Sequence, residues 1–193
     1  MPAFFEVWAK YAKDGHEQFY LDCAKASREF LHKACASPTG LNADQTGFDG
    51  AARRGGSFGF DSWRVPMNIA LDYSWACKDK EWQQDYGRRI QGFLWSKGID
   101  TFDDQFNLDG TRPQRIMRAG GYQKLRHSLG LVATAGAASL MGTQAMSWKF
   151  VDAVWNAKLE PYEDKYFDPY YDGLLYLFSL MHLSGNYRII EPA

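Results

Sequence analysis

Cysteine is scarce in this chain, and its three cysteines form no motif. Cys23, Cys35 and Cys77 are an odd number, so they cannot all pair within the chain. None of them lies in a Cys-x-x-Cys pair or in a Cys/His spacing that would hold a metal ion. Each lies in or next to an apolar helical pattern, which favours small core residues over reactive thiols. The sequence therefore indicates no metal site and gives no reason to expect a cofactor.

The chain also lacks an excess of charge and a long hydrophobic run. Its 22 Lys and Arg residues nearly balance 23 Asp and Glu residues, so the formal net charge is −1. A protein so close to neutral has no strong field to attract nucleic acid or an anionic membrane surface. No stretch approaches the ~20 apolar residues of a membrane-spanning helix. Both absences argue against nucleic acid and membranes as partners.

No targeting segment is visible at the start of the chain. Its first residues, Met-Pro-Ala-Phe-Phe-Glu, lack the basic and apolar blocks of a secretion signal. This absence favours a cytoplasmic protein, on the condition that the chain is not a piece of a longer one. If it is such a piece, a signal could lie in the preceding segment.

Apolar and aromatic residues, by contrast, are abundant. Hydrophobic residues make up 46% and charged residues 23% of the chain, which is typical of a globular protein. With 193 residues the chain can bury a sizeable core, and we expect a single domain over residues 1–193. The seven Trp and eleven Tyr residues can fill that core, but such residues also line carbohydrate clefts. The composition is compatible with a sugar-binding protein without requiring one.

Apolar residues recur at helical spacing in seven segments, and no alternating run predicts a strand. The expected helices cover about residues 3–13, 17–35, 62–77, 80–96, 129–141, 144–157 and 171–183. In the second segment, two adjoining apolar stripes predict burial on more than one side. A long Gly-rich loop precedes residue 60, and long ordered loops are often functional. Helices joined by alternating short and long connections predict an all-α fold of stacked helical hairpins.

The most informative segment is residues 58–75, Phe-Gly-Phe-Asp-Ser-Trp-Arg-Val-Pro-Met-Asn-Ile-Ala-Leu-Asp-Tyr-Ser-Trp. It puts Asp61 at the start of an apolar helix, with Arg64 one turn further on. The helix dipole and the guanidinium both favour an ionised carboxylate there. Next to aromatic rings that can stack on sugars, such a group suits the general base of a glycoside hydrolase. The simpler interpretation is an ordinary helix cap, with Arg64 as its surface partner.

Glycoside hydrolysis commonly needs a second carboxyl group as proton donor, and the sequence offers no convincing candidate. Asp72 lies on the apolar helix, and we expect it to be a buried hydrogen-bonding residue. Asp103 and Asp104 are neighbours in a loop, which predicts a solvated pair. None of the seven Glu residues lies in an aromatic or Gly-rich setting that would raise its pKa.

Several blocks along most of the chain resemble the family-8 glycoside hydrolases, inverting enzymes that cut xylan, cellulose and chitosan. The resemblance is greatest to the reducing-end xylose-releasing exo-oligoxylanases. The blocks occur in the family order: Ser27-Arg28-Glu29-Phe30-Leu31, Thr39-Gly40-Leu41, Asp61-Ser62-Trp63-Arg64, His127-Ser128-Leu129-Gly130-Leu131, Tyr170-Tyr171-Asp172-Gly173-Leu174-Leu175-Tyr176 and His182-Leu183-Ser184-Gly185-Asn186-Tyr187-Arg188. Family members fold as (α/α)6 toroids of twelve helices. The resemblance implies that this chain supplies the C-terminal half of such a toroid, about six to seven helices.

Carried over by position, Asp61 matches the general base of the family and Arg64 the arginine that orients it. His127 falls where the exo-oligoxylanases have a Leu-His-Pro barrier that closes the reducing-end side of the cleft. Only the histidine of that triplet is retained, within Arg126-His127-Ser128, so the resemblance does not extend to strict exo action. Without the resemblance, His127 would be expected to be a surface residue.

Four aromatic residues are candidates for contacts with the sugar. Trp63 lies within the block that carries the base, and Tyr166, Tyr170 and Tyr171 lie at or before the start of the last expected helix. For Tyr171, packing at the start of that helix is an equally good interpretation. The resemblance implies that these residues help to form sugar subsites.

One family feature is missing. The general acid of the family is a Glu in a Ser-Glu-Gly motif near the N-terminus of the full-length enzyme, and this chain contains no such motif. Half a toroid would also expose an apolar seam where the other helices normally pack. We therefore expect the chain to associate, either with the missing N-terminal half or with copies of itself.

The sequence thus supports three hypotheses. The first is an inverting glycoside hydrolase that acts on β-1,4-xylooligosaccharides and is incomplete as this chain alone. The second is a non-catalytic, truncated paralogue that binds oligosaccharide or assembles as a helical oligomer. The third keeps the family but moves the substrate to cellulose or chitosan.

Overall fold

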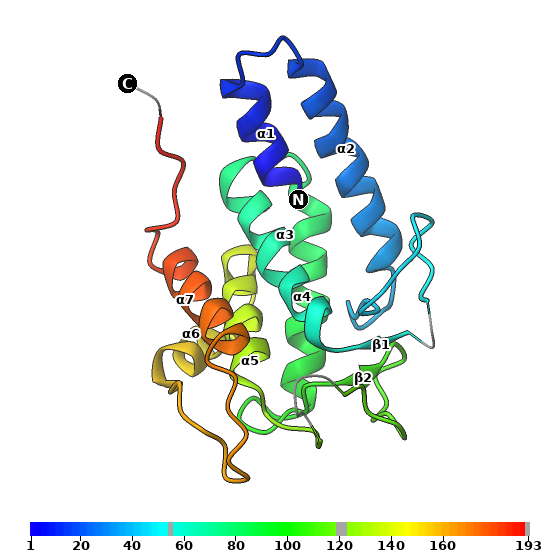
Figure 1. Ribbon diagram of the computed structural model, residues 1–193, viewed down its shortest axis with the longest axis vertical. Coiled ribbons are helices and arrows are strands. Elements are labelled where there is room, and N and C mark those ends of the chain that lie inside the picture. The colour runs from blue at the N-terminus through cyan, green and yellow to red at the C-terminus, as the bar shows by residue number, and fades with distance from the viewer. Residues whose placement is uncertain (54–55, 119–122, 192–193) are drawn as a thin grey trace.

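The computed structural model describes residues 1–53, 56–118 and 123–191, which form an all-α fold (Figure 1). The described α-helices are α1 (Pro2–Tyr11), α2 (Glu17–Ala34), α3 (Arg64–Trp75), α4 (Lys80–Ser96), α5 (Leu129–Ala137), α6 (Ser147–Asn156) and α7 (Tyr171–Leu183). Two 3-10 helices, η1 (Phe60–Trp63) and η2 (Ala138–Met141), adjoin α3 and α5. The short strands β1 (Ser57–Phe58) and β2 (Phe106–Asn107) pair antiparallel.

The helices are arranged in two layers. In the inner row α1 packs on α3, α3 on α5, and α5 on α7. In the outer row α2 packs on α1, α4 on α3, and α6 on α5. Each consecutive pair thus forms a hairpin that stacks beside the next, as expected from the sequence. The loop that contains β1 and the loop that contains β2 lie together at one end of α4 (Figure 1).

The expected helices are all present. Some of their ends differ from the prediction because part of the expected α-helix is a 3-10 helix. Helices α4 and α7 have the bounds that the sequence pattern predicts. The segment predicted as one helix from residue 62 is instead the 3-10 helix η1 followed by α3, which has Pro66 in its first turn. The segment 129–141 likewise divides into α5 and η2. None of the helices in the described part of the chain is long and apolar enough to cross a membrane.

The core lies between the two layers. Its largest fully buried side chains are those of Trp63, Tyr86, Phe58, Phe102 and Phe150. Burying side chains of this size stabilises the fold by roughly 1.5–3 kcal/mol each. These residues come from β1, η1, α4, α6 and the loop after α4, so the core ties the hairpins together.

The cysteines only partly match the expectation of core residues. Cys35 is fully buried, and burial raises the pKa of its thiol. Cys23 is half-buried and Cys77 is exposed. Cys77 ends the turn after α3 with a positive φ of 50°, which places it outside the core. The prediction was therefore wrong for Cys77, because the helix ends before the residue can reach the interior.

A buried ionic network joins α1, α2, α3 and α4. Asp72 is 1% exposed and accepts two hydrogen bonds from Arg28, at 2.8 and 2.7 Å. Gln83 donates a third hydrogen bond, at 2.7 Å, and Glu6 pairs with the same arginine at 2.8 Å. The expectation of a buried hydrogen-bonding role for Asp72 is confirmed. Because every carboxylate oxygen of Asp72 has a donor, its burial does not leave an unpaired charge.

The helices at the two ends of the stack expose large apolar side chains. Trp8 on α1 and Phe19 on α2 are 48% and 61% exposed. At the other end, Trp148 and Trp155 on α6 are 73% and 78% exposed, and Leu177 on α7 is 50% exposed. Within α2 only Ala24 is buried, so the predicted burial on more than one side is wrong for the chain as it stands. The outward stripe of α2 has no helix packed against it among the described residues.

Candidate active site

The exposed turn η1 carries Asp61, whose side chain is 60% exposed. The backbone enters this turn through Phe60, which has a positive φ of 40°. A left-handed conformation at a non-glycine residue costs of order 1–3 kcal/mol, so other contacts must hold it. The Ser62 hydroxyl donates to the Gly59 carbonyl and accepts from the Gly59 amide, both at 2.7 Å. The Tyr171 hydroxyl donates to the Phe60 carbonyl at 2.6 Å.

Asp61 and Arg64 form an ion pair on this turn. One carboxylate oxygen of Asp61 lies 2.8 Å from an Arg64 guanidinium nitrogen, and the Arg64 side chain is 46% exposed. Asp61 is the second residue of η1, and the residue at the cap position is Gly59. The simple interpretation of Asp61 as a helix cap therefore does not hold. The carboxylate is paired, open to solvent and available to a ligand.

Asp44 is a second carboxylate at this turn, and the sequence reasoning missed it. Its Oδ1 accepts a hydrogen bond from the Asp61 amide at 2.9 Å. Asp44 is half-buried, and this burial raises the pKa of its carboxyl above the ordinary value. The negative charge of Asp61 raises it further, while Arg64 and the Asp61 amide act in the opposite direction. The one signal in the sequence was the long Gly-rich loop before residue 60, in which Asp44 lies.

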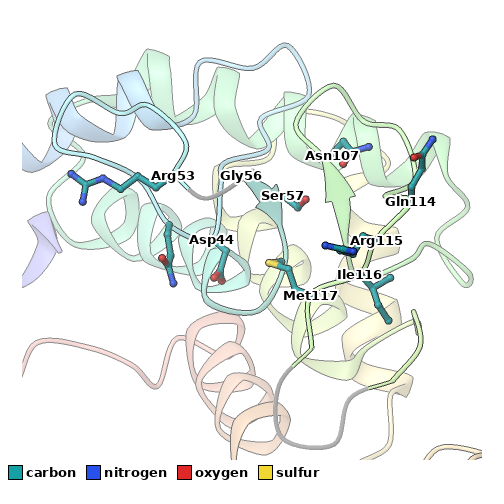
Figure 2. A pocket seen from close by; sticks show the side chains of 10 residues that line it. Asp44, Arg53, Gly56, Ser57, Asn107, Gln114, Arg115, Ile116 and Met117 are labelled. Carbon is teal, nitrogen blue, oxygen red and sulfur yellow. The ribbon is translucent and has the colours of Figure 1, made fainter.

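Asp44 also lines a hollow of about 560 Å³ beside the turn (Figure 2). Its walls are the loop that precedes β1 and the loop that follows β2. Figure 2 shows Asp44 and Met117 on facing sides of this hollow. Most of the residues that line it have polar or charged side chains; the lining consists of Asp44, Gln45, Arg53, Gly56, Ser57, Asn107, Gln114, Arg115, Ile116 and Met117.

Trp63 is placed differently from its expected role. Its side chain is 2% exposed, and its Nε1 donates to the Asp104 carbonyl at 2.8 Å. The ring lies in the core, 5.9 Å from the ring of Tyr171. No face of Trp63 is open to a sugar, so the expectation of a sugar contact is corrected to a packing role. The 3-10 geometry of η1 turns this side chain inward while Asp61 faces out.

The three tyrosines occupy different settings. Tyr171 is half-buried and uses its hydroxyl to hold η1, and burial raises the pKa of that hydroxyl. Tyr166 is half-buried beneath the guanidinium of Arg126, which lies 4.2 Å from the ring centroid. One face of Tyr166 is therefore already taken by a cation. Tyr170 is 76% exposed and is the tyrosine of the three most open to a ligand.

His127 packs on Phe102, in the loop that follows α4. Its Nδ1 is 2.9 Å from the Phe102 carbonyl, and its ring packs edge-on against the Phe102 ring. Burial lowers the pKa of His127 below its ordinary value, so the ring is neutral at pH 7. His127 lines a second hollow of about 490 Å³, together with Lys149 and Asp152 of α6. Asp61 and Arg64 do not line that hollow.

A buried polar network supports the start of α5. Asp104 is 0% exposed and accepts hydrogen bonds from the Ser128 hydroxyl and the Arg126 amide. The prediction of a solvated pair was therefore wrong for Asp104, which packing draws under α5. Asp172 accepts from the Tyr162 hydroxyl at 2.9 Å and from the Gly130 amide at 3.2 Å. Burial raises the pKa of Asp172 to about 6.

Comparison with known proteins identifies relatives of this chain. No protein-family model matches the chain. The chain is 34% identical to the reducing-end xylose-releasing exo-oligoxylanase Rex8A of Paenibacillus barcinonensis, over 98% of this chain and 48% of that protein. It is 33% identical to a reducing end xylose-releasing exo-oligoxylanase of Halalkalibacterium halodurans, over 100% of this chain and 47% of that protein. The chain thus spans about half the length of the curated relatives it matches.

Solved structures agree with the sequence comparison. A crystal structure of a reducing end xylose-releasing exo-oligoxylanase superposes with a TM-score of 0.84 at 34% identity, covering 100% of this chain and 48% of that chain. A GH8 xylobiose complex from Teredinibacter turnerae gives 0.82 at 28% identity, covering 97% and 45%. The stacked hairpins are therefore about half of an (α/α)6 toroid, as the resemblance implies. By sequence and by fold the chain is similar to enzymes of glycoside hydrolase family 8 and matches their C-terminal half.

Proposed function

We propose that this chain supplies the base-bearing half of an inverting glycoside hydrolase that acts on β-1,4-linked xylooligosaccharides. The observation that carries the proposal is the Asp61–Arg64 ion pair. The pair stands exposed on a strained turn, in a chain similar to exo-oligoxylanases along almost its whole length. A strained residue held by several hydrogen bonds commonly marks a functional site.

In the proposed reaction, Asp61 takes a proton from a water molecule as the water oxygen bonds to the anomeric carbon. The bond from that carbon to the leaving oxygen breaks, and a general acid protonates the leaving oxygen. In inverting enzymes the two carboxyl groups stand roughly 6.5–9.5 Å apart, which leaves room for the water. Arg64 holds the Asp61 carboxylate in position through their ion pair. The acid comes from a segment outside this chain, because no Ser-Glu-Gly motif is present here.

The relatives support this substrate class. Rex8A has been crystallised with xylose and, as a mutant, with an arabinofuranosyl-substituted xylotetraose, and the Teredinibacter enzyme with xylobiose. These ligands favour xylooligosaccharides over cellulose or chitosan as the substrate of the assembled protein. Tyr170 is the most open tyrosine for contact with the sugar, and His127 would border the cleft from its separate hollow.

The apolar side chains exposed at both ends of the helix stack support association with the missing N-terminal half. Trp8 and Phe19 lie at one end, and Trp148, Trp155 and Leu177 at the other. A closed toroid would cover both ends, because its two halves meet at two seams. Self-association of this chain would use the same surfaces.

A test is to express the chain together with the N-terminal half of Rex8A and to assay hydrolysis of xylotriose. We expect Asp61→Asn to lower kcat by roughly 10²–10⁴-fold, the usual contribution of an acid–base group. Asp22→Asn serves as the matched control, because Asp22 is an exposed carboxylate on α2, far along the chain from the turn. Unchanged kcat in Asp61→Asn would remove Asp61 from the mechanism.

The second candidate function is binding of oligosaccharide without hydrolysis, and the missing acid motif favours it for the isolated chain. Calorimetry with xylobiose and a hydrolysis assay on the isolated chain distinguish the two functions. Binding without turnover, combined with no turnover after assembly with the N-terminal half, would support the binding protein. Turnover after assembly supports the enzyme.

A further inference from the structure

We propose that Asp44 is a positioning residue: its carboxylate holds the turn that carries Asp61 and places a second negative charge beside that turn. What Asp61 does on this turn rests on the proposed function. The physical coupling between the two carboxylates does not, because it can be measured in the isolated chain.

The first argument is geometric. Asp44 is joined to both β1 and η1 by hydrogen bonds. Its amide donates to the Ser57 carbonyl at 2.9 Å, and its Oδ1 accepts from the Asp61 amide at 2.9 Å. The residues before it, Asn42 and Ala43, are 5% and 4% exposed, so the backbone that presents Asp44 is anchored in the interior. A side chain on an anchored backbone can hold a neighbouring turn in one conformation.

The second argument is electrostatic. Asp44 is hydrogen-bonded to the turn that carries Asp61, and one cation, Arg64, lies near both carboxylates and is paired directly with Asp61. Tyr171 is a titratable side chain packed against the turn, and it stays protonated because burial raises the pKa of its hydroxyl. A nearby like charge makes a carboxylate bind protons more tightly. The charge of Asp61 accordingly contributes to the raised pKa of Asp44, so the two carboxylates are coupled, while Arg64 pairs directly with Asp61.

The other charges that line the hollow beside the turn do not cancel the repulsion between Asp44 and Asp61. The other charged lining residues of the hollow are Arg53 and Arg115. Figure 2 shows the Arg53 side chain extending away from Asp44. Arg115 is exposed to solvent, where its charge is screened. Arg64 is the cation that governs the pair, because it is bound to Asp61.

Two substitutions separate the two roles of Asp44. Asp44→Asn keeps an oxygen that can accept the Asp61 amide but removes the charge. Asp44→Ala removes both the acceptor and the charge. Asp49→Asn is the matched control, because Asp49 lies in the same loop and its Oδ1 also accepts a loop amide, that of Ala51, at 3.0 Å.

The experiment that does not depend on activity is a carboxyl ¹³C NMR titration of the isolated chain. Coupling is reciprocal, so it appears in whichever of the two carboxyls titrates second. We expect the pKa of Asp44 to fall in Asp61→Asn, because a like charge has been removed. In Asp49→Asn the pKa of Asp44 should stay unchanged. No change in Asp44 in Asp61→Asn, and none in Asp61 in Asp44→Asn, would overturn the inference.

The second readout is the kinetics of the chain assembled with the N-terminal half. We expect Asp44→Ala to lower kcat by about tenfold with little change in KM, because the turn that aims Asp61 is released. Asp44→Asn keeps an acceptor for the Asp61 amide and should restore most of that loss. Wild-type kcat in Asp44→Ala would contradict the inference. If Asp61→Asn itself left hydrolysis unchanged, the proposed function would fail, and the NMR titration would still decide the coupling.

Discussion

The Asp61–Arg64 ion pair contributes little to folding stability, although we propose that it is central to the function. Both partners of the Asp61–Arg64 pair are about half exposed, and pairs of this kind stabilise a protein by only ~0–1 kcal/mol. The strained φ of Phe60 acts in the opposite direction. The turn is therefore not explained by stability, and its geometry is better understood as a way to present a carboxylate.

Replacing Arg64 should affect activity far more than folding. We expect Arg64→Ala to change the free energy of unfolding by less than about 1 kcal/mol, because the ion pair is exposed. In the assembled enzyme the same change should lower kcat by roughly 10-fold or more, because the base is no longer aimed. Arg88→Ala is the matched control, since Arg88 also pairs with an exposed Asp three residues away. Urea unfolding and xylotriose hydrolysis measure the two effects; equal kcat in both variants would contradict the prediction.

Asp172 should make folding stability depend on pH. Its pKa is raised to about 6, so the folded protein binds the proton more tightly than the unfolded chain does. This contribution is fully present below the ordinary pKa of Asp and is lost as the pH rises through about 6. Between pH 4 and pH 7 we expect wild type to lose up to about 3 kcal/mol relative to Asp172→Asn, which cannot ionise. Urea unfolding of both proteins at several pH values tests this; a constant difference would contradict it.

Among the helices, the close approach of α5 and α7 supports the site most directly. Gly130 at the start of α5 lies against Asp172 and Leu175 of α7, and a Cβ at Gly130 would lie 2.6 Å from the Asp172 Oδ1. The same Cβ would lie 3.3 Å from the ring of Trp63. Because Trp63 belongs to η1, this contact links the packing of the two helices to the turn that carries Asp61.

A methyl group at that contact should separate the helices. We expect Gly130→Ala to lower the free energy of unfolding by roughly 1–3 kcal/mol, the usual cost of overpacking. Gly92→Ala on α4 is the control: a Cβ there would meet only a methionine methyl, at 3.9 Å, so the change should be neutral or stabilising by up to about 1 kcal/mol. Chemical denaturation measures both. Equal stability of the two variants would mean that α5 and α7 can part without cost.

For the molecule as a whole, both ends of the helix stack are open. The chain matches about half of the length of its relatives, and Trp side chains on α6 are exposed. Both observations are expected for a half-toroid with open ends. The apolar outer stripe of α2 fits this picture too. Its sequence predicts burial on more than one side, whereas in the structure Ala24 is the one buried residue of α2.

The open ends should make the isolated chain associate. We expect sedimentation velocity to show concentration-dependent oligomers, and the double change Trp148→Ser and Trp155→Ser to weaken them at least several-fold. Phe48→Ser is the control, because Phe48 is 97% exposed but lies in a loop rather than on an end helix. A monomer at every concentration, or equal weakening by the control, would contradict the prediction.

Local pattern in the chain was enough for the helices and for the ion pair. Apolar spacing predicted α4 and α7 to the residue, and the three-residue separation predicted the contact of Asp61 with Arg64. These features depend on neighbours along the chain, where the helical repeat fixes which side chains meet. The family blocks added the half-toroid, because they preserve the order of those helices.

Long-range packing determined the surroundings of the candidate site. Asp44 approaches Asp61 from 17 residues away, Asp104 is drawn beneath α5, and Trp63 is turned into the core. His127 faces a different hollow from the one that Asp44 lines. Burial and loop closure bring together residues that no sequence period connects, so the surroundings of Asp61 could be known only from the folded chain.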